Sequence, residues 1–293
     1  MSVLTTTPKV SEELNKRHKT LARLAQQMVM MVRSFLPDVT IKVIGDGAYS
    51  VIELGLACVK RQLSLLAPLR LDARLFAPPP VPRPHQLGRP RVVGKRPPNL
   101  STVLPDPKTV WETLTVTWYA GTERQLEVTT GTALWSSTGS DPLPLRWVLT
   151  RDPDDQRDPK ASFSTNQAQC AEEIVEDFVK RWPIEVTYEE SRAHLGVETQ
   201  RQWSDLAIER STPCLLGVYS VVVLLGLALH PDGHIPLEQA AWYPKTHATF
   251  SDVLATVRRH LWGGLTFQTS AAHPDLCLVP RSDLTRLMQA ACY

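Results

Sequence analysis

The sequence lacks the features that mark several common protein classes. Its five cysteines are odd in number, and no two have a Cys-x-x-Cys spacing, which argues against a zinc site or a disulfide framework. The longest uncharged run, Cys214–Leu229, has 16 residues, whereas a membrane span needs about 20. We therefore expect reduced thiols, a cytoplasmic protein with no membrane partner, and a buried core helix over this run.

Familiar catalytic signatures are also missing. The sequence contains no Gly-x-Ser-x-Gly, no Gly-x-x-x-x-Gly-Lys and no His-Glu-x-x-His, and its first residues have no apolar signal-peptide core. The formal net charge is only +2, from 32 basic and 30 acidic residues, so the overall charge does not indicate a nucleic-acid partner. The distribution of charges and carboxylates is therefore more informative than their total.

The first part of the chain has the pattern of an α/β module. Apolar residues at steps of three and four predict a helix over residues 11–36, begun by Ser11 and ended by Pro37. Residues 39–44 predict a strand that stops at Gly45-Asp46-Gly47. A helix near 50–62 and a second strand within 63–71 follow, so we expect the two strands to pair in parallel.

Residues 77–100 are dense in proline and predict irregular structure. Between Arg70 and Arg96 there are seven Lys or Arg and one acidic residue, Asp72. Such an extended basic arm can lie along a phosphate backbone or enter a minor groove, which makes DNA-binding candidates of Arg89, Arg91, Lys95 and Arg96. A solvated linker is the alternative interpretation.

The rest of the chain changes character twice. Residues 110–165 alternate between apolar and polar side chains, which predicts antiparallel strands. Helical patterns then run from Cys170 to about Leu229 and return at residues 248–262. We expect five segments: the first part of a catalytic core (1–76), a basic Pro-rich linker (77–100), a β-rich insertion (101–168), a helical C-terminal part of the core (169–265) and an irregular tail (266–293).

Two carboxylates are the candidates for catalysis. Asp46 directly follows a strand, so it should lie at the sheet's carboxyl edge, where α/β proteins bind ligands. Phe178, Arg181, Glu185 and Arg192 have a spacing that places them close to one face of a single helix. Paired carboxylates suit Mg²⁺, and neighbouring arginines can hold phosphates. The alternatives are a turn aspartate at Asp46 and an ion pair between Arg181 and Glu185.

The stretch "FVKRWPIEVTYEESRAHLG" (178–196) resembles the signature of DDE transposases from bacterial insertion sequences. That family has Tyr, Arg, Glu and Lys where this chain has Phe178, Arg181, Glu185 and Arg192. The blocks "IGDGAYS", "PLRLDARLF", "AAWYPKTHATFSDVLATVRRHLW" and residues 184–213 are also similar to the DDE-superfamily endonuclease group. The resemblance covers about residues 20–262.

The resemblance implies an α/β fold that is ribonuclease-H-like, incomplete, and interrupted by the β-rich insertion. It makes Asp46 the second catalytic aspartate and Glu185 the third acid, both as ligands of Mg²⁺ or Mn²⁺. Arg181 and Arg192 would contact DNA or orient the metal ligands. The implied activity is DNA strand cleavage and transfer at the element ends and target, in the nucleoid, with a homodimer or an upstream transposase fragment as a possible partner.

The sequence departs from the family pattern in one respect. No aspartate precedes Asp38, so the first catalytic acid is missing and the chain resembles an N-terminally truncated transposase. A catalytically inactive remnant that binds DNA or a partner transposase is therefore the second hypothesis. Asp152 is a weaker candidate for the missing acid. A glycosidase-like carboxylate pair is a remote third reading, against which the basic arm and the two arginines argue.

Overall fold

The computed structural model describes residues 7–81, 90–154, 156–199, 201, 204–238, 244–262, 268–273 and 275–291. The chain divides into two compact units, Met1–Ile184 and Glu185–Tyr293. The finer division into five segments stays a prediction.

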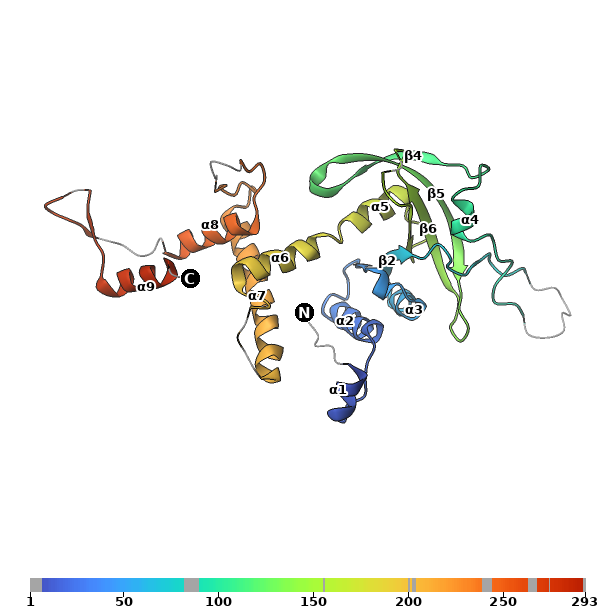
Figure 1. The fold of residues 1–293 in the computed structure, drawn as a ribbon, viewed down its shortest axis with the longest axis horizontal. Coiled ribbons are helices and arrows are strands. Elements are labelled where there is room, and N and C mark those ends of the chain that lie inside the picture. Colours follow the sequence, from blue (N-terminus) through green and yellow to red (C-terminus); the bar gives the residue numbers. More distant parts are fainter. Residues whose placement is uncertain are drawn as a thin grey trace. The chain divides into compact units, whose positions relative to one another are not determined.

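The first unit is built on a seven-stranded mixed sheet (Figure 1). Its strands are β1 (Lys42–Ile44), β2 (Ser64–Leu69), β3 (Leu75–Phe76), β4 (Glu112–Thr117), β5 (Glu123–Trp135), β6 (Leu143–Arg151) and β7 (Lys160–Ser164). The order is β1-β2-β7-β6-β5-β3, with β4 also paired to β5. Only β1 and β2 are parallel, and the other pairs are antiparallel. The predicted α/β class is confirmed and is consistent with a ribonuclease-H-like fold. The strands of the β-rich segment extend the same sheet.

Helices cover both faces of this sheet. Those of the first unit are α1 (Pro8–Glu13), α2 (Leu21–Phe35), α3 (Ile52–Lys60), α4 (Leu100–Val103) and α5 (Ala171–Val179). Because side chains alternate along a strand, Leu65 faces the cluster that includes α3, while Leu66 faces the cluster that includes α5. Two apolar clusters therefore fix the sheet between α2 and α3 on one side and α5 on the other.

The single helix predicted over residues 11–36 is wrong. Asn15 adopts a left-handed backbone with φ 51°, which asparagine tolerates and a helix interior does not. The side chain of Thr20 then caps α2 by accepting from the N–H of Arg23 at 3.3 Å. Ser11 is not an N-cap: it is buried inside α1, which begins after Thr7.

The second unit is helical. It contains most of α6 (Pro183–Leu195), then α7 (Asp205–Leu229), α8 (Phe250–Trp262), β8 (Gln268–Thr269), β9 (Cys277–Leu278) and α9 (Arg281–Ala291). Its core packs Val222 against α8, and the rings of Tyr219 and Phe250 stack at 4.3 Å. The prediction of an irregular tail is wrong for α9, whose first turn begins with N–H groups of Asp283 and Leu284 donating to the carbonyl of Pro280.

The buried core helix predicted over Cys214–Leu229 is also wrong. α7 packs against α8 along one side, where a Cβ at Gly226 would lie 2.5 Å from Val253 Cγ1, but Leu224 is 65% exposed. Only 11% of its most apolar window is buried. Among the described residues, Glu209–Leu229 is the one stretch with the length and hydropathy to cross a membrane, and a single such helix is weak support for a span. The absence of a membrane partner stays a prediction.

A buried carboxylate organises the start of α8. The side chain of Asp252 has no exposed surface and accepts from Lys245 Nζ at 3.1 Å and from the N–H groups of Thr249 and Glu238 at 2.9 Å each. Burial raises the pKa of Asp252, but these donors outweigh it and lower the pKa to about 2. Because the folded pKa lies below the ordinary value of 3.8, the stabilisation is complete above about pH 4 and is lost as the pH falls through 2.

We therefore expect Asp252→Asn to lower the free energy of unfolding of the second unit by about 2 kcal/mol at pH 7. The variant should also lose stability less steeply than the wild type between pH 4 and pH 2, as measured by urea unfolding. Asp232→Asn is the matched control, because Asp232 accepts from the N–H of His234 but its side chain is 66% exposed. Parallel pH curves for the wild type and Asp252→Asn would contradict the assignment.

Candidate active site

Asp46 lies at the carboxyl edge of the parallel strand pair. It follows β1 by two residues and caps the short 3-10 helix η1 (Gly47–Tyr49), with Oδ1 accepting from the N–H of Ala48 at 2.8 Å. Gly45 is buried, and a Cβ at that position would lie 2.9 Å from Tyr49 Cβ, so the turn requires glycine. The turn role expected as an alternative is therefore present, and the Asp46 side chain stays exposed to a ligand.

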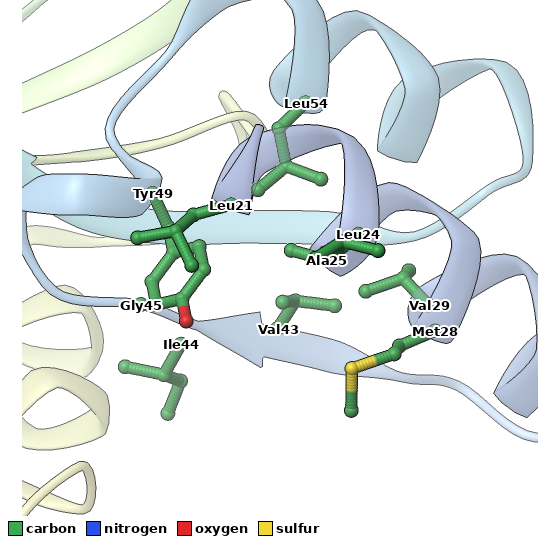
Figure 2. Close-up of a pocket in the computed structure, with 10 residues that line it drawn as sticks. All are labelled: Leu21, Leu24, Ala25, Met28, Val29, Val43, Ile44, Gly45, Tyr49 and Leu54. Carbon is green, nitrogen blue, oxygen red and sulfur yellow. The ribbon is translucent and has the colours of Figure 1, made fainter. Parts of the chain in front are cut away.

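An apolar pocket of about 240 Å³ lies beside this turn, between α2 and β1 (Figure 2). In Figure 2, Val43 points towards α2 and Ile44 points to the opposite side of β1. The pocket is lined by Leu21, Leu24, Ala25, Met28, Val29, Val43, Ile44, Gly45, Tyr49 and Leu54. None of these side chains is charged, so the pocket suits an apolar ligand better than a metal ion or a phosphate. Among the described residues, β1 pairs only with β2, so its other edge is open.

A buried polar network ties β1 to α5. The carboxylate of Asp177 accepts hydrogen bonds from Lys42 on β1, from Gln169 Nε2 at 2.7 Å and from Lys180 Nζ at 2.9 Å. Burial raises the pKa of Asp177, but the two lysine ammonium groups outweigh it and lower the pKa. Ile44 and Phe178 both pack against the same apolar cluster. The side chain of Ile44, two residues before Asp46, and that of Phe178, at the start of the 178–192 segment, therefore pack on the same face of the sheet.

The expectation that residues 178–192 share one stripe of one helix is wrong. Phe178 belongs to α5, Arg181 lies in the connecting turn, and Pro183 begins α6. Proline lacks an N–H and restricts the residue before it, so it suits the first position of a new helix and not a helix interior. Glu185 lies in the first turn of α6 and Arg192 in the last, and their separation of seven residues keeps them near one face.

Arg192 is held by a carboxylate that follows α6. Its Nε and Nη2 donate to Glu198 at 2.6 and 3.0 Å, and this paired contact raises the pKa of Arg192. Both side chains are more than half exposed. A phosphate would therefore compete with Glu198 for the guanidinium.

The basic arm is anchored at both ends. The N–H of Gly94 donates to the carbonyl of Ala77 at 2.8 Å, and the N–H of Ala77 donates to the carbonyl of Lys95 at 2.9 Å. Arg91 and Lys95 are exposed, and Arg96 Nη2 donates to Asn99 Oδ1 at 2.8 Å. Arg89 lies outside the described residues. Binding of DNA by these four residues stays a prediction.

The structure does not place the two catalytic candidates relative to each other, because Asp46 belongs to the first unit and Glu185 begins the second. Within the described residues, no group of three His, Cys, Asp or Glu side chains is arranged to hold a metal ion. Asp152, the weaker candidate for the missing catalytic acid, is already engaged. Its side chain is buried and accepts a hydrogen bond from Arg124 Nη2 at 2.6 Å. Asp46, an exposed carboxylate at a sheet edge, has the hard oxygen donors that Mg²⁺ prefers.

Sequence reasoning missed an aromatic surface near the 178–192 segment. Trp182 is 46% exposed, and its ring centroid lies 5.6 Å from that of Tyr119. Tyr119 lies in the turn between β4 and β5, which is far from Trp182 in the chain. No local pattern links the two rings, because only the packing of α5 on the sheet brings them together.

Comparison with known proteins supports the resemblance read from the sequence. No curated protein matches the chain. Residues 6–133 match the model of the family described as DDE superfamily endonuclease, a class that uses divalent metals and acts on DNA. The match includes Asp46 and the basic arm and ends before Glu185. Residues 6–133, which are less than half of the chain, are therefore similar to the DDE superfamily of endonucleases.

Proposed function

We propose that this chain takes part in transposase-type cleavage and transfer of DNA strands, with Asp46 and Glu185 as ligands of Mg²⁺ or Mn²⁺. The observation that carries the proposal is the tie between β1 and α5. Lys42 bonds to Asp177, and Ile44 and Phe178 share an apolar cluster. Asp46 follows Ile44 by two residues, and Glu185 follows Phe178 by seven.

The chain length allows the two carboxylates to meet. Seven residues span at most about 25 Å when fully extended, and less when part of the segment is helical. The bond from Ala48 to Oδ1 fixes the rotamer of Asp46, so its carboxylate is held in place before a ligand binds.

The residues present fit divalent-metal chemistry. Bound Mg²⁺ would supply charge stabilisation at the phosphodiester and activate the attacking oxygen. The protein's own groups would bind and align the phosphates of the DNA: these groups are Arg181, Arg192, Arg89 and the exposed Arg91, Lys95 and Arg96 of the arm. The substrates would be the ends of an insertion sequence and its target in the nucleoid.

A second function has one observation in its favour. Because the described residues contain no three-membered ligand cluster, the first catalytic acid would have to come from another polypeptide, such as an upstream transposase fragment. A chain without that acid would be a remnant that binds DNA or the partner transposase and does not cut.

A nicking assay separates the two functions. The substrate is supercoiled plasmid that carries the DNA flanking the gene, with Mg²⁺, with Mn²⁺ or with EDTA. We expect metal-dependent nicking that Glu185→Gln abolishes and that Glu189→Gln, an exposed acid one turn further along α6, leaves unchanged. Tight, salt-sensitive binding without nicking under every metal condition would support the remnant and contradict the cleavage proposal.

A further inference from the structure

A buried carboxylate of the first unit, Asp177, takes no part in the proposed metal site. Its side chain is 7% exposed, and its Oδ2 accepts from Lys42 on β1 and from Gln169 Nε2 at 2.7 Å. The Oε1 atom of Gln169 in turn accepts from the hydroxyl of Ser164, the last residue of β7, at 2.8 Å. Gln169 and Ser164 are also buried. A chain of hydrogen bonds therefore runs from β1 through α5 to the end of β7.

This network lies beside apolar packing. Ile174 and Val175, on the same helix as Asp177, belong to the apolar cluster against which Ile44 of β1 packs. A buried ion pair gains little net stability over apolar side chains of similar size, because both charges lose their water. It does require one geometry, since the charged atoms must meet, whereas apolar side chains can slide past one another. The network is therefore better suited to fix a position than to stabilise the sheet.

The position of β1 needs such a contact. The strand is three residues long, and among the strands that the structure describes it pairs with β2 alone. Residues 39–44 read Val-Thr-Ile-Lys-Val-Ile, which are β-branched side chains with a single charge. Because side chains repeat every second residue, a shift of β1 by two residues would again present β-branched side chains to both faces of the sheet. Apolar packing alone therefore defines this register weakly.

Lys42 distinguishes the observed register from a shifted one. In Figure 2, Val43 points towards α2, and Lys42, the preceding residue, bonds to Asp177 on the α5 side of the sheet. Lys42 is the one lysine or arginine of residues 39–44. A shift by two residues would bring Thr40 to the position of Lys42 and take the ammonium away from Asp177. The buried carboxylate would then lose a charged donor, which disfavours the shifted register.

We propose that Asp177 is a positioning residue, which through Lys42 fixes the register of β1 on β2 and so sets the place of the Asp46 carboxylate. A shift of two residues moves a strand by about 6.6 Å. Mg²⁺ holds its oxygen ligands at only about 2.0–2.1 Å, so a carboxylate displaced by that amount leaves the ion. The inference rests on the proposed function for the role of Asp46 as a metal ligand, whereas the register of β1 can be measured without it.

Amide hydrogen exchange of the full chain, without metal or DNA, tests the register. The reporter is the N–H of Gly45, which directly precedes Asp46 and donates to the carbonyl of Leu66 at 2.9 Å. We expect Lys42→Met and Asp177→Asn each to speed exchange of this amide at least about tenfold, because each loses a hydrogen bond between charged groups. Lys42→Arg keeps a charged donor and should exchange at the wild-type rate.

Two controls separate positioning from loss of charge and from loss of stability. Lys180→Met removes the other ammonium that bonds to Asp177, but Lys180 follows the last residue of α5 and its side chain is 67% exposed. Val128→Ala shortens a buried side chain of β5, which β2, β7 and β6 separate from β1 in the sheet. In both variants, exchange at Gly45 should stay within about twofold of the wild type, because local opening of β1 is unchanged.

The Mg²⁺ requirement of nicking gives a second readout, which a purely structural role would not change. Lys42→Met and Asp177→Asn should each raise the Mg²⁺ concentration for half-maximal nicking about tenfold, because only the fraction of molecules in the correct register binds the ion. At saturating Mg²⁺ the rates should differ less than about threefold from the wild type, because the ion then selects that register.

Three results would overturn the proposal. They are unchanged exchange at Gly45 in Lys42→Met, an equal rise in Lys180→Met, and faster exchange at Gly45 with an unchanged Mg²⁺ requirement. A wild type that does not nick under any metal condition would refute the cleavage proposal, and the exchange measurement would still decide whether Asp177 fixes the register of β1.

Discussion

Asp46→Asn is expected to reduce metal-dependent DNA nicking about a thousandfold. The substitution keeps the size of the side chain and the carbonyl oxygen that accepts from Ala48, so the turn after β1 should remain intact. It removes the negative charge that a divalent ion requires, and the charge stabilisation supplied by such an ion amounts to several kcal/mol, of which about 4 kcal/mol corresponds to a thousandfold in rate. The measurement is the initial nicking rate at saturating Mg²⁺.

Asp106→Asn is the matched control for this experiment. Asp106 is also exposed in a turn, and its Oδ1 accepts from the N–H of Lys108 at 2.9 Å, so the local chemistry is the same in a different place. The control should nick at the wild-type rate. Equal activity of Asp46→Asn and the wild type would mean that Asp46 serves only the turn.

Phe163→Ala is expected to lower the free energy of unfolding of the first unit by about 4 kcal/mol. Phe163 lies on the central strand β7, has no exposed surface, and is opposite Ala67 on β2 and Trp147 on β6. Its ring meets Trp135 edge to face at 5.4 Å. Truncation removes a large buried side chain and leaves a cavity that the two neighbouring strands cannot close.

Urea unfolding followed by tryptophan fluorescence measures this loss, since Trp135 and Trp147 lie beside the substituted ring. Phe35→Ala is the control: this side chain is 71% exposed at the end of α2, and its removal should cost less than about 0.5 kcal/mol. A similar loss for both variants would show that the sheet is not the core of the first unit.

The sequence predicted those parts of the fold that depend on local pattern. Strands β1 and β2 and the helix between them follow from a β-branched run, a turn at Gly45-Asp46-Gly47 and an apolar helix, and the structure pairs the two strands in parallel. The alternating residues of β4, β5 and β6 likewise predicted antiparallel strands. Along the first half of β5, buried residues alternate with more exposed ones, so the period of two is visible in the sequence, whereas β2 is buried on both faces.

The sequence-based predictions were wrong where a helix boundary depends on a single residue or where burial depends on tertiary contacts. Asn15 and Pro183 each break a helix that apolar periodicity alone would continue. Apolar composition predicted burial for α7, but burial depends on the number of neighbours, and α8 covers only one side. The rings of Tyr119 and Trp182 come into contact only when α5 packs on the folded sheet. No spacing in the sequence could therefore reveal this contact.

Iron-mediated cleavage of the protein backbone tests most directly whether Asp46 and Glu185 share one divalent ion. Fe²⁺ bound in place of Mg²⁺ reduces added hydrogen peroxide to hydroxide and a hydroxyl radical, and the radical cuts the chain next to the ligands. If the two carboxylates share an ion, the wild type should be cut near residue 46 and near residue 185, and Asp46→Asn and Glu185→Gln should each lose both cuts. Cutting near residue 46 that persists unchanged in Glu185→Gln would contradict the shared site and, with it, the proposed cleavage chemistry.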